Sequence, residues 1–318
     1  MTKKLFLGVD GGGTKTTAVV FDGDGNFVAK SVGESINYYS NGLETARENM
    51  KKIIDSLAQK TGTSVFEAAV IGMSALNDRA NDDELSAFAD GIIEADAILM
   101  DSDLYIALEA LCCDGECGVV VSGTGSMVVR RKENGEIRHS GGWGHILGDE
   151  GSGYQIGLEG IRSAIRAVER YGEKTDLTDE VLSYFGIDNI YDLIDIFYTQ
   201  GVPRQKIAAF AINVRLAAQH GDKVAYNILK TQAAELAKTA YSQFRKLSDG
   251  AKIGLWGGMF ENCELYRYMF DSALTENKPL DVKVLDFTPE VGAVISAYKL
   301  KFNNISDTII EKLRNTYE

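Results

Sequence analysis

The chain contains few of the residues that usually hold a metal ion or build a disulfide framework: three histidines and four cysteines in 318 residues. The histidines lie far apart, with no HExxH or HxH pairing of the kind found in metalloenzymes. Cys112, Cys113 and Cys117 cluster in the segment LCCDGEC, which lacks the spaced second pair of a zinc ribbon. We therefore interpret these cysteines as reduced thiols at the end of a helix.

The chain also lacks an excess of positive charge and any long hydrophobic run. Lysine and arginine total 33 against 46 acidic residues, a net charge of −13, which repels the phosphates of nucleic acids and of anionic membranes. The N-terminal segment MTKKLFLGVDGGG has an apolar run that breaks at Asp10, too short for a signal peptide or a membrane span. We expect a cytoplasmic protein that binds neither nucleic acid nor membrane.

Hydrophobic residues, in contrast, make up 45% of the chain. That content at this length is enough to bury more than one core, so we expect two domains. Residues 4–33 have the pattern of a strand, a Gly/Thr hairpin, a second strand, an acidic turn and a third strand. The same order returns over residues 118–142, with an NG turn before the last strand. We interpret the repeat as an internal duplication of a three-stranded meander.

Helical patterns follow each meander. Apolar residues recur at three- and four-residue steps over residues 43–59 and 152–172. Residues 204–247 are helical by composition, with a break at the HGD sequence. Further short strands are expected at residues 66–75, 96–100, 251–256 and 281–285. Strands that alternate with helices after an antiparallel start predict a mixed α/β sheet in each half. We place the two domains at residues 1–116 and 117–318.

The first hairpin, GVDGGGTK, comes close to a P-loop without matching it. Gly8 and Gly13 have the required four-residue gap, but Thr14 precedes Lys15, whereas a P-loop has lysine directly after the second glycine. The β-branched residues that follow favour a strand, whereas a P-loop opens a helix. A glycine hairpin can still bind phosphate, because successive backbone N–H groups can approach and wrap an anion. A single hairpin of this kind could equally be a plain turn.

The second hairpin, SGTGS at residues 122–126, occupies the equivalent place in the second half. Two equivalent hairpins favour a shared ligand over two plain turns, because halves related by a pseudo-twofold axis could grip one polyphosphate from both sides. Asp10 ends the first strand, where a carboxylate could hold Mg²⁺ through water, as hard oxygen ligands do beside nucleotides. We therefore expect a nucleotide site that involves both hairpins.

Eight segments of the sequence occur in a characteristic order: GVDGGGTKT, SINYYS, DSDLYIAL, GVVVSGTGS, GGWGHILGDEGSGY, AAQHGDKVAYNIL, LWGGMFEN and PEVGAVISA. Together they resemble the N-acetylglucosamine kinase and BadF/BadG/BcrA/BcrD ATPase group of the actin-like ATPase superfamily. The GGWGHxxGDEGS string is the most specific, since it is much rarer than a glycine hairpin. The resemblance covers nearly the whole chain. It implies an α/β fold of two ribonuclease H-like (actin-like ATPase) domains, whose mixed sheets flank a nucleotide cleft.

The resemblance also implies roles for single residues. Asp103 matches the catalytic aspartate and, with Asn37, Gly142, Trp143 and Asp149, the set that contacts the sugar. Asp10 would hold magnesium through water. The implied ATP-binding residues are Asp10, Gly11, Gly12, Gly13, Thr14, Lys15, Thr124, Gly125, Ala208, Gly257, Gly258 and Asn262.

Several of these residues have ordinary structural alternatives. Asp103 could be the N-cap of the helix that follows it, a common use of aspartate, and Asp101 offers a second carboxylate; we prefer Asp103 as the catalytic residue and Asp101 as the cap or a supporting residue. Trp143 could belong to the core, but its flanking glycines favour a backbone exposed to a ligand. We expect His145 and Glu150 to hold the shape of this loop by hydrogen bonds.

The function implied is that of an ATP- and Mg²⁺-dependent amino-sugar kinase. It would transfer the γ-phosphoryl group to a hydroxyl, by expectation the 6-OH, of N-acetylglucosamine or a related sugar such as N-acetylmuramic acid or glucosamine. Phosphoryl transfer to an alcohol needs positioning, a metal and one carboxylate, which Asp103 could supply. The alternative is a BadF-type ATPase that activates a dehydratase or reductase through an iron–sulfur cluster, which the cysteine cluster keeps open. We also expect a homodimer.

Overall fold

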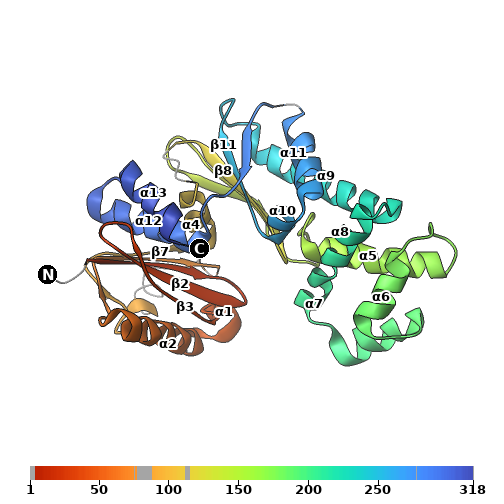
Figure 1. The fold of residues 1–318 in the computed structure, drawn as a ribbon, viewed down its shortest axis with the longest axis horizontal. Helices are drawn as coiled ribbons and strands as arrows, with labels where there is room; N and C mark the ends of the chain where they lie inside the picture. Colours follow the sequence, from red (N-terminus) through yellow and green to blue (C-terminus); the bar gives the residue numbers. More distant parts are fainter. Residues whose placement is uncertain (1–3, 75, 77–87, 112–114, 277, 318) are drawn as a thin grey trace. The chain divides into compact units, whose positions relative to one another are not determined.

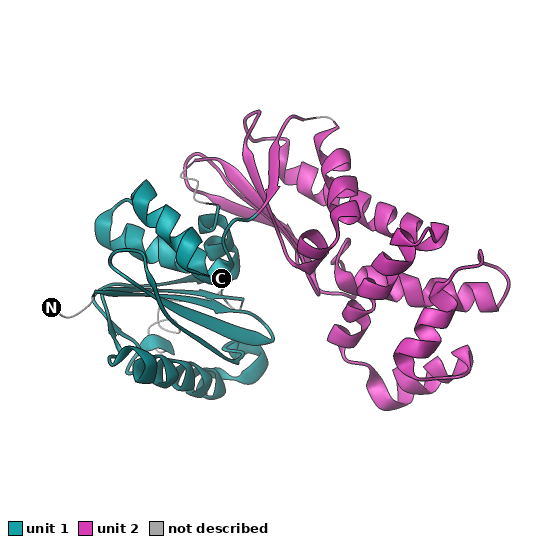
Figure 2. Cartoon of the chain, viewed as in Figure 1, with its two compact units in different colours: residues 1–114, 285–318 teal, residues 115–284 magenta. Residues whose placement is uncertain are grey.

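The computed structural model describes residues 4–74, 76, 88–111, 115–276 and 278–317 (Figure 1). The chain divides into two compact units (Figure 2). Unit 1 comprises residues 1–114 and 285–318, and unit 2 comprises residues 115–284. The sequence predicts a second domain at residues 117–318, whereas in the structure residues 285–318 belong to unit 1.

Unit 1 is built on a five-stranded sheet in the order β3-β2-β1-β5-β7. The first three strands form the antiparallel meander expected from the glycine hairpin, and β5 and β7 extend it in parallel. The strands are β1 (Leu5–Gly11), β2 (Lys15–Asp22), β3 (Phe27–Glu34), β5 (Ala68–Met73) and β7 (Ile98–Ser102). The mixed sheet is therefore the one that the sequence predicts.

Helices cover both faces of this sheet (Figure 1). Alternate residues of β1, Leu5, Leu7 and Val9, pack with Ile53 and Leu57 of α2 (Leu43–Thr61) in one hydrophobic core, as the two-residue period of a strand requires. The other face of the sheet packs against α12 (Pro289–Phe302). The remaining helices and strands of unit 1 are α1 (Tyr38–Asn41), β4 (Val65–Phe66), β6 (Glu94–Ala95), α4 (Asp103–Glu109) and α13 (Asp307–Thr316).

Close packing explains why the C-terminal segment belongs to unit 1. A Cβ added to Gly8 of β1 would stand 2.3 Å from the backbone oxygen of Glu290 in α12, so the absence of a side chain lets the helix lie directly on the strand. The ring of Phe6 lies 4.3 Å from that of Tyr298, centroid to centroid. Both contacts join the N-terminal and C-terminal parts of the sequence, so no local sequence pattern predicts them.

Unit 2 repeats the same sheet, in the order β10-β9-β8-β11-β12. An antiparallel meander is again followed by two parallel strands. The strands are β8 (Cys117–Ser122), β9 (Ser126–Arg131), β10 (Ile137–Gly141), β11 (Lys252–Trp256) and β12 (Asp281–Val284). The identical topology of the two sheets supports the duplication proposed from the sequence.

The helices of unit 2 include the long region expected at residues 204–247. It is broken at the HGD sequence, where Oδ1 of Asp222 accepts a hydrogen bond from the backbone of Ala225 (2.8 Å) and caps α9. A further break falls at Phe210. The elements are α5 (Gly153–Val168), α6 (Leu177–Phe185), η1 (Ile190–Asp192), the π-helix η2 (Asp195–Gly201), α7 (Arg204–Ala209), α8 (Ala211–Gln219), α9 (Lys223–Phe244), α10 (Gly258–Asn262) and α11 (Glu264–Thr275).

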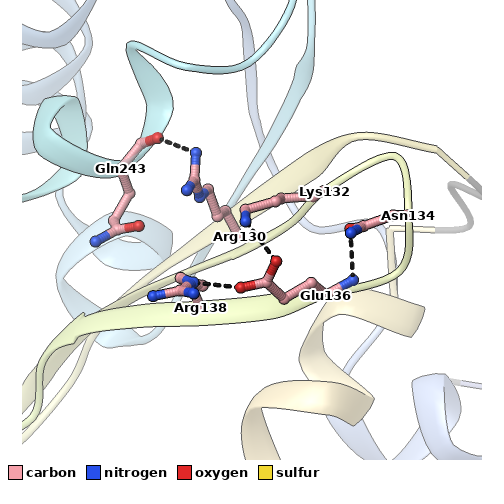
Figure 3. Close-up of polar contacts among 6 residues, drawn as sticks. All are labelled: Arg130, Lys132, Asn134, Glu136, Arg138 and Gln243. Atoms are coloured by element: carbon pink, nitrogen blue, oxygen red, sulfur yellow. Dashed lines mark hydrogen bonds and ion pairs between the residues drawn. The ribbon is translucent and has the colours of Figure 1, made fainter.

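A group of charged side chains fixes the β9–β10 hairpin (Figure 3). Glu136 accepts hydrogen bonds from Lys132 and from Arg138, and these two cations lower its pKa to about 2. Arg130 is buried on β9 and donates to the backbone oxygen of Gln243 in α9 at 3.0 Å. The second meander is thus tied at its turn and against the helix that covers it.

Candidate active site

The first glycine hairpin presents bare backbone to solvent. It joins β1, which ends at Gly11, to β2, which begins at Lys15, and Gly13 and Thr14 at its tip are exposed. A Cβ added to Gly13 would have no atom within 4 Å. The carbonyl of Gly12 accepts a hydrogen bond from the Ser35 hydroxyl at 2.9 Å. The hairpin is therefore held at its base and open at its tip, as a phosphate-binding turn requires.

Asp10 stands at the foot of this hairpin, partly buried beside two other acidic residues. Burial, followed by the charges of Glu290 and Asp103, raises the pKa of Asp10 to about 7, and Lys15 opposes the shift. No set of three or more side chains that could hold a metal occurs in the described ranges. The chemistry of Asp10 nevertheless fits a nucleotide-borne magnesium ion, because a cation there would relieve the repulsion among these carboxylates.

Asp103 is the first residue of α4, directly after β7. The N-cap of α4 is Ser102, whose hydroxyl accepts a hydrogen bond from the backbone of Tyr105 at 3.2 Å. The suggestions that Asp103 or Asp101 caps this helix are therefore wrong. Asp101 instead supports the cap, since its Oδ1 accepts from the backbone of Ser102 at 2.6 Å and lies 3.2 Å from its hydroxyl.

The two carboxylates differ in their electrostatic setting. Burial raises the pKa of both Asp101 and Asp103, and hydrogen bonds from nearby backbone N–H groups oppose the shift. Of these two aspartates, only Asp103 contributes its charge to the raised pKa of Asp10. Asp103 therefore faces the same part of unit 1 as the foot of the hairpin, where a proton acceptor for phosphoryl transfer would be needed.

Asn37 is tied to the hairpin by hydrogen bonds that the sequence does not reveal. Its Oδ1 accepts from the backbone of Ser40 (3.1 Å) and caps α1, while its Nδ2 donates to the hydroxyl of Ser74 (3.0 Å). Its backbone N–H donates to Ser35 (3.1 Å), the residue that also holds Gly12. Asn37 thus has a defined orientation and retains a second amide hydrogen for a ligand.

Unit 2 contains a pocket of about 610 Å³ beside the second hairpin, a volume in the range of small-molecule sites. Four residues assigned to ATP lie in its wall, Thr124, Ala208, Gly258 and Asn262. They come from the β8–β9 turn, α7 and α10, which are far apart in the sequence. Residues of the wall that the sequence did not single out include Gly123, Gln205, Ile212 and Arg215.

The glycine pair at the end of β11 is shaped for this pocket. Gly257 has a φ of +104°, and a Cβ there would stand 2.5 Å from the backbone oxygen of Ser122, so only glycine fits without strain. Glu261 accepts from the Gly257 backbone N–H at 2.9 Å, and the side chain of Asn262 donates to the Gly258 carbonyl at 3.2 Å. These contacts fix α10 as one wall of the pocket.

The loop at residues 141–151, called the GDEGS loop below, has an unusual backbone. Its left-handed residues are Gly141, Gly142, Gly144, Asp149 and Gly151. Trp143 is 74% exposed, so the alternative that it belongs to the core is wrong. Its indole is available to a ligand, in keeping with the predicted contact to the sugar.

Hydrogen bonds hold the GDEGS loop against the second hairpin. The hydroxyl of Ser126 donates to the carbonyl of Glu150 at 2.7 Å. Nε2 of Gln155 donates to the carbonyls of His145 (3.0 Å) and Gly148 (2.8 Å). His145 and Glu150 do help to shape the loop, as expected, but the bonds that do so use their main-chain oxygens. The hairpin and the loop therefore form one structure.

Asp149 is the buried acid of this loop, with 3% of its surface exposed. Burial raises its pKa, while the charge of Arg204 and hydrogen bonds from the backbones of Ser126 and Gly144 oppose the shift. Its carboxylate lies against Gly125 of the hairpin, where a Cβ would be 2.8 Å from Oδ2. Residues expected at the sugar and at the phosphates thus meet at one point in unit 2.

Comparison with known proteins identifies the family to which the chain belongs. A family model described as the BadF/BadG/BcrA/BcrD ATPase family matches residues 7–297, which is most of the chain. The chain belongs to this ATPase family. As a member of this family the chain uses ATP. The two glycine hairpins and the pocket residues had led us to expect this nucleotide.

Curated relatives of this family member extend over almost its whole length. It is 32% identical over 304 residues to the N-acetylmuramic acid/N-acetylglucosamine kinase of Clostridium acetobutylicum, covering 92% of this chain and 98% of the relative. It is 30% identical over 320 residues to the N-acetyl-D-glucosamine kinase of Dictyostelium discoideum, covering 95% and 100%.

A solved structure from Chromobacterium violaceum, of a candidate N-acetylglucosamine kinase, has the same fold. It aligns with a TM-score of 0.75 at 21% identity and covers 93% of this chain and 99% of its own. The two-domain α/β fold expected from the resemblance is therefore confirmed.

The cysteine cluster is only partly within the structure of this ATPase-family chain. Cys112 and Cys113 lie outside the described residues. Cys117 is the first residue of β8 and is fully buried, so its thiol is poorly placed to ligate an iron–sulfur cluster shared between subunits. Among the helices that the structure describes, none is long and apolar enough to cross a membrane.

Proposed function

We propose that this ATPase-family member is an amino-sugar kinase that transfers the γ-phosphoryl group of ATP to the 6-OH of N-acetylglucosamine or a related sugar, such as N-acetylmuramic acid or glucosamine. Two near-full-length relatives with 32% and 30% identity are named as kinases of such sugars. Their names favour this reading over the BadF-type activator of a dehydratase or reductase.

The observation that carries the proposal is the contact between the second hairpin and the GDEGS loop. Gly123 and Thr124 of the hairpin line the pocket, and the next residue, Gly125, lies against the buried Asp149 of the loop. A nucleotide in the pocket would place its phosphates at the hairpin, within reach of a sugar on the loop. Trp143, exposed on the same loop, offers an apolar face on which a sugar ring can stack.

The chemistry assigned to the chain is one in-line displacement. The oxygen of the sugar hydroxyl forms a bond to the γ-phosphorus, the bond to the β–γ bridging oxygen breaks, and ADP leaves with that electron pair. Asp103 accepts the hydroxyl proton, and the pKa of this carboxyl, raised by burial, makes it a better acceptor. Asp10 would hold Mg²⁺ through water, and the ion would neutralise charge on the phosphate oxygens.

The experiment compares Asp103→Asn with Asp101→Asn, two neighbouring aspartates that are both buried enough to have raised pKa values. We expect Asp103→Asn to lower kcat by about a hundredfold or more, the usual contribution of a positioned acid or base, and to leave ATP binding intact. Asp101→Asn should retain most of its kcat, since asparagine keeps the side-chain oxygen that accepts from Ser102 and supports the cap of α4. The reverse order of the two kcat losses would overturn the assignment.

We further propose a cytoplasmic homodimer, as expected from the sequence. Sedimentation equilibrium of the purified chain would show the mass of a dimer, twice 34.7 kDa, and a monomer at micromolar concentration would refute it.

A further inference from the structure

One charged side chain at the candidate site has no role in the assignments above. Arg204 begins α7, and its Nη2 lies 3.1 Å from the point where a Cβ of Gly125 would stand. Oδ2 of Asp149 lies 2.8 Å from the same point. The guanidinium therefore lies beside the hairpin, at the place where it meets the GDEGS loop.

The hydrogen bonding of Arg204 is incomplete. Its Nε is shielded from solvent and has no hydrogen-bond partner among the described residues. A buried donor without an acceptor costs about 1–3 kcal/mol, so such a group in a native protein needs an explanation, for example a catalytic role, a bound ion or a water molecule. Neutral backbone N–H groups of the hairpin cannot accept its hydrogen, whereas an anionic oxygen held by that hairpin could.

The same helix also lines the nucleotide pocket. Gln205 and Ala208 of α7 both contribute to its wall, together with Gly123 and Thr124 of the hairpin. Arg204 precedes these residues on α7 and lies at the Gly125 end of the hairpin. A nucleotide whose adenosine fills the pocket would extend its phosphates along the hairpin toward Arg204.

Resting on the proposed kinase function, we propose that Arg204 is a further catalytic residue, which donates hydrogen bonds to oxygens of the γ-phosphoryl group during transfer. Guanidinium is permanently charged and has a planar set of donors that matches phosphate oxygens. Charge spreads over the three equatorial oxygens of the transferred group in the transition state. Arg204 therefore contributes more to the transition state than to ATP binding, and its loss should lower kcat.

The test uses Arg204→Met and Arg204→Lys, with Arg162→Met as the matched control because Arg162 lies on α5, is 55% exposed and pairs only with Glu159 in the described structure. We expect Arg204→Met to lower kcat by about a hundredfold to a thousandfold, the usual effect of losing one donor to a transition-state oxygen. Arg204→Lys should retain about a tenth of kcat, because it keeps the charge without the fork.

A second readout is independent of the sugar. Calorimetric titration with ADP and with AMP-PNP measures how much the γ-phosphate adds to binding. Arg204→Met should lose part of that difference, by a smaller factor than its loss of kcat, while its ADP affinity stays within about threefold. If the wild-type protein phosphorylates no sugar but its preference for AMP-PNP over ADP still depends on Arg204, the kinase proposal is wrong, while the contact between Arg204 and the γ-phosphate is supported.

The opposite result is equally clear. If Arg204→Met raises the KM for sugar while kcat and the AMP-PNP difference remain at wild-type values, Arg204 acts only by balancing the charge of Asp149. That outcome overturns its assignment to the phosphoryl group. If Arg204→Met does not fold, Arg204→Lys provides the test. A wild-type kcat in Arg204→Lys, together with an unchanged difference between its AMP-PNP and ADP affinities, would also contradict the proposal.

Discussion

Replacing Asp10 by asparagine should stabilise the ligand-free protein at pH 8, although it removes the residue proposed to hold magnesium. Burial and the neighbouring carboxylates of Glu290 and Asp103 raise the pKa of Asp10 from 3.8 to about 7. The folded protein at pH 8 therefore carries an ionised group that its surroundings disfavour. Asparagine has nearly the same shape and carries no charge, so Asp10→Asn removes this repulsion.

The sign and size of the effect follow from proton linkage. Because the folded-state pKa is raised, the stability that protonated Asp10 contributes is complete below the unfolded pKa of 3.8 and is lost as the pH rises through about 7. The full shift corresponds to about 4 kcal/mol, at about 1.4 kcal/mol for each pKa unit. We expect Asp10→Asn to exceed wild type by about 2–4 kcal/mol at pH 8, the lower figure allowing for relaxation around a partly exposed group.

Denaturant unfolding at pH 5 and at pH 8, in the presence of a chelator, measures this difference. The advantage of Asp10→Asn should grow between the two pH values, whereas Asp55→Asn, an exposed aspartate on α2, should differ from wild type by less than about 0.5 kcal/mol at both. Added Mg²⁺ and ATP should narrow the gap, because they would stabilise wild type more. A variant that is no more stable than wild type at pH 8 refutes the electrostatic argument.

Three further substitutions separate binding from stability. Asn37→Asp keeps the acceptor that caps α1 but loses the amide donor, so the KM for sugar should rise about tenfold or more with little change in Tm; an unchanged KM would remove Asn37 from the sugar site. Trp143→Ala should raise the KM for sugar and shift stability by less than about 0.5 kcal/mol, since the side chain is 74% exposed, and a large loss of Tm would contradict that exposure. Gly257→Ala should cost about 1–3 kcal/mol and weaken ATP binding, because its φ is +104° and its Cβ would meet Ser122; unfolding and ATP titration at wild-type values would show that the pocket wall is not fixed as described.

Much of the fold follows from local patterns in the sequence. The two meanders were predictable because Gly/Thr turns separate runs of β-branched residues, and the break before α9 was predictable because Asp222 is a good N-cap. The identity of the α4 cap was not, since Asp101, Ser102 and Asp103 are all residue types that cap helices. Only the geometry selects Ser102.

Long-range packing decided what the sequence pattern could not. The placement of residues 285–318 in unit 1 depends on Gly8 admitting the backbone of Glu290, a contact between positions that no periodicity connects. Arg204 could not be predicted for the same reason. In the sequence it is one arginine at the start of a helical region, and only the structure places it beside Gly125 and Asp149. The family motifs, by contrast, predicted Thr124, Ala208, Gly258 and Asn262 as ATP-binding residues, and the structure places all four in the wall of one pocket.

An amino-sugar kinase and an ATPase are distinguished by ADP release from ATP and Mg²⁺, measured for the wild-type chain with N-acetylglucosamine, N-acetylmuramic acid, glucosamine, glucose or no sugar. Phosphorus NMR of the same reactions identifies the product. We expect little ADP without sugar, rapid release with at least one amino sugar, a slower reaction with glucose, and a 6-phosphate as product. ADP release at the same full rate with and without every sugar, and with inorganic phosphate as the only product, would contradict the kinase and favour an ATPase that acts on another partner.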